Sequence, residues 1–152
     1  EQVKGLDALI VPVGGGGLIG GIALALRELA PHIRVFGSEP DGADDAARSK
    51  AAGRLIPQEG PNTIADGLLT SLGELTWPIV RDHVEEIVTM GEDEIIEAMR
   101  FVWERMKIII EPSCATAVAA AWSPKFMAHR ELKRVGLVIT GGNVDLAKLP
   151  WS

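Results

Sequence analysis

The sequence predicts an α/β domain with a mostly parallel sheet flanked by helices. Short apolar runs alternate with segments of helical composition along the whole chain, an order typical of strands joined by helical crossovers. The first run, residues 8–13, is almost continuously apolar, as expected of a strand buried on both faces. Four consecutive glycines, residues 14–17, follow it and precede a helix pattern over residues 18–29. A strand, a glycine loop and a helix therefore open the fold.

The next elements complete a β–α–β unit. Pro31 interrupts the first helix pattern, and residues 33–38 form the second strand candidate. Such a unit is expected to be right-handed with parallel strands. The Ala-rich residues 42–52 predict a helix, and Gly53 is placed to end it as a C-cap.

The middle of the chain predicts an irregular stretch and then regular elements. Residues 55–70 contain prolines and glycines that interrupt any helical or strand periodicity of the apolar residues. A short helix is predicted over residues 75–83 and a third strand over residues 86–90. From residue 92 the apolar positions make one stripe of a long amphipathic helix, which residues 108–112 end.

The last elements repeat the alternation. Residues 113–122 are Ala-rich and predict a helix with Ser113 as its N-cap. Residues 135–139 predict a fourth buried strand, followed by the polar and glycine-rich residues 140–143. Since ligands bind beyond the carboxyl ends of parallel strands, three loops become candidates for a site: residues 14–17, 39–45 and 140–143.

Composition narrows the classes of function. With 152 residues, 47% of them hydrophobic, the chain is long enough for one domain with a buried core. A net charge of −6 favours neither nucleic acid nor a membrane surface as a partner, and no apolar run is long enough to span a bilayer. The single cysteine, Cys114, indicates a reducing compartment such as the cytoplasm.

The glycine loop predicts an anion site. Glycines let a backbone curl around a ligand and turn several N–H groups toward it, and the following helix start adds further unpaired N–H groups. Residues 15–20 also fit the dinucleotide pattern G-x-G-x-x-G, with Glu39 about 20 residues downstream for a ribose. Four glycines exceed what that turn requires and favour one compact anion, most simply a phosphate. Both interpretations stay open on spacing alone.

An acidic cluster follows the second strand. Glu39, Asp44 and Asp45 could bind a hard cation together with turn carbonyls. Acidic residues at a helix start also complement the helix dipole, and a solvated helix end explains the cluster more simply.

Six segments in order resemble serine racemase and the related serine/threonine dehydratases, pyridoxal-phosphate enzymes of fold type II. The resemblance runs through nearly the whole chain. The segments that carry it are residues 11–18, 38–45, 63–67, 103–107, 110–112 and 138–146.

The resemblance implies a cofactor site for pyridoxal 5'-phosphate. The phosphate would be held by Gly14, Gly15, Gly16, Gly17 and the backbone of Leu18. Gly67 would lie against the cofactor ring, and the Thr140 hydroxyl would bind the pyridine nitrogen. The family usually has Ser at the position of Thr140, so the hydroxyl is kept and a methyl group is added.

The resemblance also implies a divalent-metal site. Its ligands would be Glu39, the backbone carbonyl of Ala43, and Asp45. This match favours a bound Mg²⁺, or Ca²⁺ or Mn²⁺, over a solvated helix end. In the family the metal is structural and regulatory.

Several other residues have both a functional and a simpler explanation. Lys107 and Asn143 match positions of a nucleotide effector site, although a solvated lysine and a turn asparagine explain them more simply. Glu111 could lie near the cofactor or cap a helix. Cys114 is expected to be a buried filler. We expect the histidines to lie at the surface: His32, His83 and His129.

The resemblance requires a lysine that forms a Schiff base with the cofactor. In the family it lies upstream of the glycine loop, and no lysine of this chain has that context. We therefore expect no catalytic residue in this chain. Residues 1–152 resemble the C-terminal part of the large domain, without the N-terminal half and the small domain.

The implied parent enzyme acts on a small amino acid. It would interconvert L- and D-serine and eliminate water from serine, giving pyruvate and ammonia. Two alternatives remain: a threonine or hydroxyaspartate dehydratase, and an inactive fragment that acts by association. The expected partners are a second copy or a complementary N-terminal half, and the isolated chain should be inactive.

Overall fold

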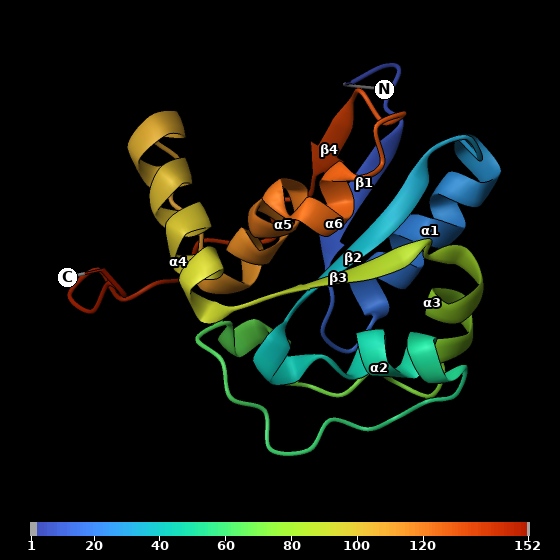
Figure 1. The fold of residues 1–152 in the computed structure, drawn as a ribbon, viewed down its shortest axis with the longest axis horizontal. Coiled ribbons are helices and arrows are strands. Elements are labelled where there is room, and N and C mark those ends of the chain that lie inside the picture. Colours follow the sequence, from blue (N-terminus) through green and yellow to red (C-terminus); the bar gives the residue numbers. More distant parts are fainter. Residues whose placement is uncertain (1–2, 152) are drawn as a thin grey trace.

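One four-stranded parallel sheet organises the computed structural model, which describes residues 3–151 (Figure 1). The strands lie in the order β3-β2-β1-β4, and Ala8 of β1 pairs with Arg34 of β2 and with Val135 of β4. The strand bounds are β1 Ala8–Pro12, β2 Arg34–Pro40, β3 Glu86–Met90 and β4 Val135–Leu137. The predicted fold class is confirmed. Residues 1, 2 and 152 of the predicted domain lie outside the described residues.

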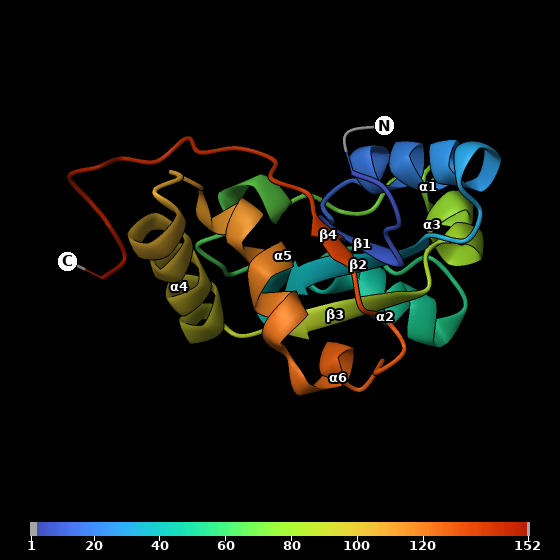
Figure 2. The ribbon, with the colours of Figure 1, turned by 90° about the horizontal axis from the view of Figure 1, so that it is seen from above.

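Helices cover both faces of this sheet. Figure 2 shows α1 and α3 on one face and α5 and α6 on the other. The helix bounds are α1 Gly17–Leu29, α2 Asp45–Ala52, α3 Trp77–His83, α4 Glu92–Phe101, α5 Pro112–Trp122 and α6 Pro124–Met127. Short helical turns are η1 Asp41–Ala43, η2 Asp66–Leu68 and the π-helical η3 Val102–Met106.

Alternation along the strands gives each face its own core. Successive side chains of a strand point to opposite faces, so Phe36 packs with α4, α5 and α6 whereas Val35 packs with α1 and α3. In β3, Val88 belongs to the first core and Ile87 to the second. Because both faces are covered, the strands read as continuous apolar runs in the sequence.

The fourth strand differs from its prediction. We expected a buried strand over residues 135–139, but β4 ends at Leu137 and all its residues are only half-buried. The reason is its position at the edge of the sheet, where it pairs with β1 alone.

The helix starts and ends also differ from their predictions. Helix α5 begins at Pro112 with Glu111 as the N-cap, so the prediction that Ser113 caps it was wrong. The long helix predicted from residue 92 is α4 followed by η3, and it ends at Lys107, which has a left-handed backbone with φ of 59°. Gly53 caps α2 as predicted, donating its N–H to Lys50.

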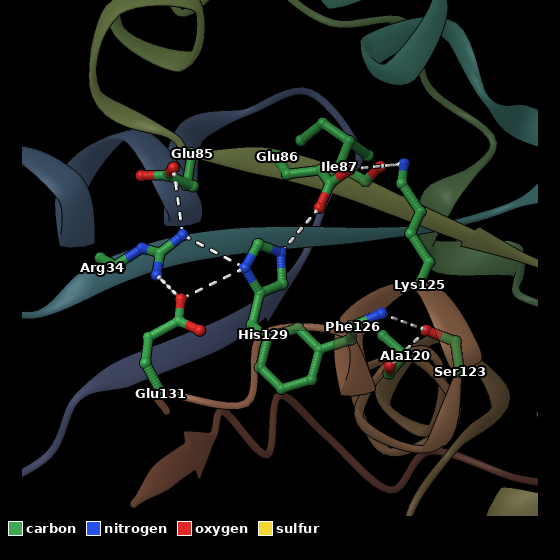
Figure 3. Close-up of polar contacts among 10 residues, drawn as sticks. All are labelled: Arg34, Glu85, Glu86, Ile87, Ala120, Ser123, Lys125, Phe126, His129 and Glu131. Carbon is green, nitrogen blue, oxygen red and sulfur yellow. Dashed lines mark hydrogen bonds and ion pairs between the residues drawn. The ribbon is translucent and has the colours of Figure 1, made fainter. Parts of the chain in front are cut away.

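A polar network, whose side chains Figure 3 shows, holds the amino-terminal ends of β2 and β3, at the opposite end of these strands from the candidate loops. The His129 ring lies 5.1 Å from the Phe36 ring, and its Nε2 lies 3.2 Å from the Glu86 carboxylate. Arg34 binds both Glu85 and Glu131. His129 is therefore half-buried in a packed cluster, and the expectation that it lies free at the surface was wrong.

No helix within residues 3–151 has the length and apolar character needed to cross a bilayer.

Candidate functional site

The predicted cofactor residues meet around one cavity at the carboxyl edge of the sheet. The cavity has a volume of about 250 Å³. Three separate parts of the chain contribute to it: the turn after β1, the segment around η2, and the region from α5 to the residue after β4. Its lining residues are Pro12, Gly14, Gly15, Gly16, Gly17, Leu18, Ile19, Gly67, Leu68, Glu111, Ser113 and Thr140.

The glycine loop presents its backbone to this cavity. Within the described part of the chain, the N–H groups of residues 14–18 donate no hydrogen bond. Gly16 has a φ of 82° and is the N-cap of α1, a backbone conformation that glycine adopts without strain. Unpaired N–H groups at a helix start attract anions. The loop therefore fits a phosphate, and it does so without any basic side chain.

Thr140 lies on another side of the same cavity. Its backbone N–H contacts the buried Cys114 sulfur at 3.4 Å, whereas its hydroxyl makes no hydrogen bond to any described residue. Cys114 is fully buried, as its interpretation as a filler requires. A free hydroxyl in a cavity can donate to or accept from a ligand.

Glu111 fixes the loop that follows Thr140. Its carboxylate accepts a hydrogen bond from the Asn143 N–H at 2.9 Å, and its own N–H donates to Gly141 at 3.1 Å. A Cβ at Gly141 would lie 3.0 Å from both carboxylate oxygens. Glu111 therefore caps α5 through its backbone and holds a site loop through its side chain.

Ser113 plays a part that the sequence did not indicate. Its hydroxyl accepts a hydrogen bond from the Gly67 N–H at 3.0 Å, and only 3% of the residue is exposed. A Cβ at Gly67 would lie 2.9 Å from this hydroxyl, so the two segments approach closely. The first turn of α5 thus contacts both the Gly67 segment and, through Glu111, the loop after Thr140.

The predicted metal ligands lie apart from this cavity, at the end of β2 and the start of α2. Glu39, Ala43 and Asp45 are all buried. The Glu39 carboxylate accepts hydrogen bonds from Ala46 at 3.2 Å and Ala47 at 2.9 Å. Asp45 accepts one from the Leu72 N–H at 2.7 Å. The two carboxylates are therefore not solvated, although Glu39 does bind the start of α2 as the simpler explanation expects.

The electrostatics of this pair fit a cation. Burial raises the pKa of the Glu39 carboxyl to about 8, and the neighbouring Asp45 carboxylate adds to the rise. Burial also raises the pKa of Asp45. No group of three or more metal-binding side chains occurs within residues 3–151. Two carboxylates and a carbonyl are nevertheless oxygen donors of the kind that hard cations take, so the metal set stays a prediction.

The dinucleotide interpretation requires Glu39 to reach a ribose. Glu39 is fully buried, and each of its oxygens already binds a backbone N–H of α2. Its carboxylate therefore stabilises the start of a helix and cannot meet a nucleotide without leaving it.

Several other predicted residues lie elsewhere. The exposed Lys107 binds the Glu104 carbonyl through Nζ. Asn143 lines a second cavity of about 400 Å³ beneath the C-terminal segment, together with Lys148. The nucleotide effector site stays a prediction. No lysine lines the 250 Å³ cavity within the described residues.

Comparison with known proteins identifies the family of the chain. A family model described as "Pyridoxal-phosphate dependent enzyme" matches residues 1–141. Serine racemase of Arabidopsis thaliana is 52% identical over 152 residues, which are 98% of this chain and 46% of the relative. The beta-hydroxyaspartate dehydratase of Paracoccus denitrificans is 50% identical and is covered to 48%. The chain spans about half the length of these relatives.

Solved structures share the fold as well as the sequence. Maize serine racemase superposes with a TM-score of 0.93 at 49% identity, covering 95% of this chain and 46% of that one. The processed form of threonine deaminase isoform 2 from Solanum lycopersicum gives a TM-score of 0.88 at 31% identity, covering 97% and 41%. The alternating strands and helices therefore form the same sheet as in these enzymes.

Proposed function

Because the chain belongs to the pyridoxal-phosphate dependent enzymes, we propose that it forms the phosphate-binding side of a serine racemase and dehydratase. One observation carries the proposal: unpaired backbone N–H groups and a free threonine hydroxyl line the same 250 Å³ cavity. The N–H groups of Gly14, Gly15, Gly16, Gly17 and Leu18 would bind the cofactor phosphate. The whole enzyme's activity is inferred from relatives about twice as long as this chain.

The other side of the cavity would hold the cofactor ring. Gly67 lines the cavity without a side chain, and the Thr140 hydroxyl would bind the pyridine nitrogen. When bound, pyridoxal phosphate withdraws electrons from the substrate's α-carbon. A hydroxyl in place of a carboxylate would leave the pyridine nitrogen unprotonated, which would suit proton removal and β-elimination.

The groups that move protons would come from outside these residues. None of the lining residues is a lysine. The Nζ atoms of Lys50 and Lys125 donate hydrogen bonds to backbone carbonyls near the amino-terminal end of β3. This chain would therefore bind and orient the cofactor, and a complementary N-terminal half would supply the Schiff-base lysine. Alone it should not turn over substrate.

A close second candidate is the dehydration of a hydroxyaspartate. The 50% identity to the Paracoccus dehydratase is almost equal to that with the plant racemase. Both reactions use the same cofactor side, and substrate choice would depend on residues outside this chain.

We further propose a divalent cation at Glu39, the Ala43 carbonyl and Asp45. Its support is the burial of two neighbouring carboxylates that no basic side chain contacts directly in the described structure. Asp44 lies between them in the sequence but pairs with Arg48 at 2.7 Å, so it is not part of the set. The cation would stabilise the β2–α2 turn.

Reconstitution tests the proposed function. We would co-express this chain with the N-terminal half of the Arabidopsis relative, add pyridoxal phosphate and serine, and measure D-serine and pyruvate. Borohydride reduction followed by mass spectrometry would locate the modified lysine. Activity with the modified lysine in the N-terminal half supports the proposal. A reduced adduct on a lysine of this chain would contradict it.

A further inference from the structure

The hydroxyl of Thr76 makes contacts that its position in the sequence does not explain. Thr76 precedes α3 as its N-cap, yet its side chain makes no capping hydrogen bond. Its Oγ1 lies 2.7 Å from the Gly15 carbonyl oxygen and 3.0 Å from that of Gly73. It also accepts a hydrogen bond from the Gly73 N–H at 3.1 Å. The shorter contact is the one to the glycine loop, 61 residues earlier in the chain.

The same carbonyl has a second partner. The Gly73 N–H donates a hydrogen bond to the Gly15 carbonyl oxygen at 3.2 Å, so this oxygen is bound by both Thr76 and Gly73. Neither of them lines the 250 Å³ cavity. The Gly15 carbonyl is therefore anchored to a neighbouring segment behind the cavity wall.

Peptide geometry turns this anchor into an orientation of the loop. In a trans peptide the C=O and the following N–H point in opposite directions. Holding the Gly15 carbonyl toward Gly73 and Thr76 therefore turns the Gly16 N–H away from them. That N–H donates no hydrogen bond to a described residue, and Gly16 lines the cavity.

Gly16 packs closely against the same segment. A Cβ on Gly16 would lie 2.6 Å from Leu72 and 2.7 Å from the Thr76 Oγ1. The loop therefore lies directly against the residue that anchors it.

We propose that Thr76 is a positioning residue for anion binding: by holding the Gly15 carbonyl, it orients the Gly16 N–H toward a phosphate ester in the cavity. This inference rests on the proposed cofactor function of the glycine loop. Thr76 itself touches no ligand. Its effect is specific to the phosphate group, since it acts only through the loop.

The test compares ligands that differ only in the phosphate. We would measure dissociation constants of pyridoxal phosphate and pyridoxal for the unaltered protein, Thr76→Val and Thr76→Ser. Valine keeps the shape but removes the hydroxyl, and serine restores it. Thr76→Val should weaken pyridoxal phosphate binding about threefold to tenfold, the range expected for one hydrogen bond. Pyridoxal binding should change less than about twofold, and Thr76→Ser should recover the loss.

A control makes the same chemical change elsewhere. Thr89 lies in β3, on the far side of β2 from the glycine loop, and Thr89→Val should alter neither constant. If Thr76→Val loses affinity for both ligands equally, or for neither, the role of Thr76 is overturned but the proposed function is not. An unaltered protein that binds both ligands equally would overturn the proposed function as well.

If Thr76→Val does not fold, a measurement on the unaltered protein still tests the orientation of the Gly16 N–H. On titration with inorganic phosphate, the ¹⁵N–¹H resonance of Gly16 should shift with the glycine loop, whereas that of Gly53, the C-cap of α2, should stay. An unmoved Gly16 resonance in a protein whose other loop resonances respond would overturn the inference.

Discussion

The hydroxyl of Ser113 accepts a hydrogen bond from the backbone N–H of Gly67 at 3.0 Å, which ties α5 to the Gly67 segment of the 250 Å³ cavity. Ser113→Ala should lower the free energy of unfolding by about 1 kcal/mol, as expected for one lost hydrogen bond. It should also weaken pyridoxal phosphate binding, because Gly67 is no longer held. Urea unfolding and ligand titration measure the two effects.

Ser123→Ala is the matched control for Ser113. Ser123 is also buried and caps α6 by accepting from the Phe126 N–H at 3.1 Å, away from the cavity. Ser123→Ala should lower the free energy of unfolding by a similar amount and leave ligand binding unchanged. Equal binding by both variants would contradict a role for Ser113 in the site.

Gly16 and Gly21 should respond oppositely to alanine. Gly16→Ala places a Cβ at positive φ and 2.6 Å from Leu72, so it should lower the free energy of unfolding by more than about 1 kcal/mol. A Cβ on Gly21 would meet nothing within 4 Å, and Gly21→Ala should stabilise α1 by up to about 1 kcal/mol. Thermal unfolding of the two variants checks this pair, and a stable Gly16→Ala protein would contradict the described loop.

A divalent cation should stabilise the protein through Glu39. Adding Mg²⁺ at about 100 times its dissociation constant should raise the free energy of unfolding by about 2.7 kcal/mol, and chelation should reverse the gain. Glu39→Gln should abolish the response because the amide removes a negative charge from the set. Asp44→Asn should keep it, since Asp44 pairs with Arg48 instead. An identical Mg²⁺ response in Glu39→Gln would exclude this site.

Asp7 should make the edge strand sensitive to acid. Its carboxylate accepts hydrogen bonds from the N–H groups of Arg134 at 2.8 Å and Lys133 at 2.7 Å, directly before β4. These bonds lower the pKa of Asp7 below its ordinary value of 3.8. A lowered pKa means that the stabilisation is complete well above pH 3.8 and is lost as the pH falls through the folded-state pKa.

The corresponding variant is Asp7→Asn, which can still accept a hydrogen bond but carries no charge. Between about pH 6 and about pH 3, the urea midpoint of the unaltered protein should fall more than that of Asp7→Asn. Parallel curves for the two proteins would show that this carboxylate contributes nothing to the pH dependence.

Much of the fold could be predicted because periodicity reflects burial. The strand predicted over residues 86–90 is β3 to the residue. The π-helical η3 could not be predicted, since its apolar stripe continues that of α4 and only the backbone changes its turn. The exposure of β4 depends on its place at the sheet edge, which the apolar residues 135–139 do not encode.

The candidate site also has a part that the sequence predicts and a part that it does not. The glycine loop and Thr140 follow the ends of β1 and β4, so topology alone predicts that they meet, whereas Gly67 lies in η2 and follows no strand. Ser113 and Thr76 act through single hydroxyl contacts with residues 46 and 61 positions away. Such contacts leave no local pattern, and both residues look like ordinary helix caps. His129 was missed for the same reason, because its partners come from β2 and β3.

The most direct test of the account is equilibrium binding of pyridoxal phosphate to this protein, with pyridoxal and inorganic phosphate as comparison ligands. The unpaired N–H groups of the glycine loop should make pyridoxal phosphate bind at least about tenfold more tightly than pyridoxal, because charge-assisted hydrogen bonds are the stronger ones. Inorganic phosphate should compete. Equal affinities for pyridoxal phosphate and pyridoxal, without competition by phosphate, would contradict the assignment of the cavity to the cofactor.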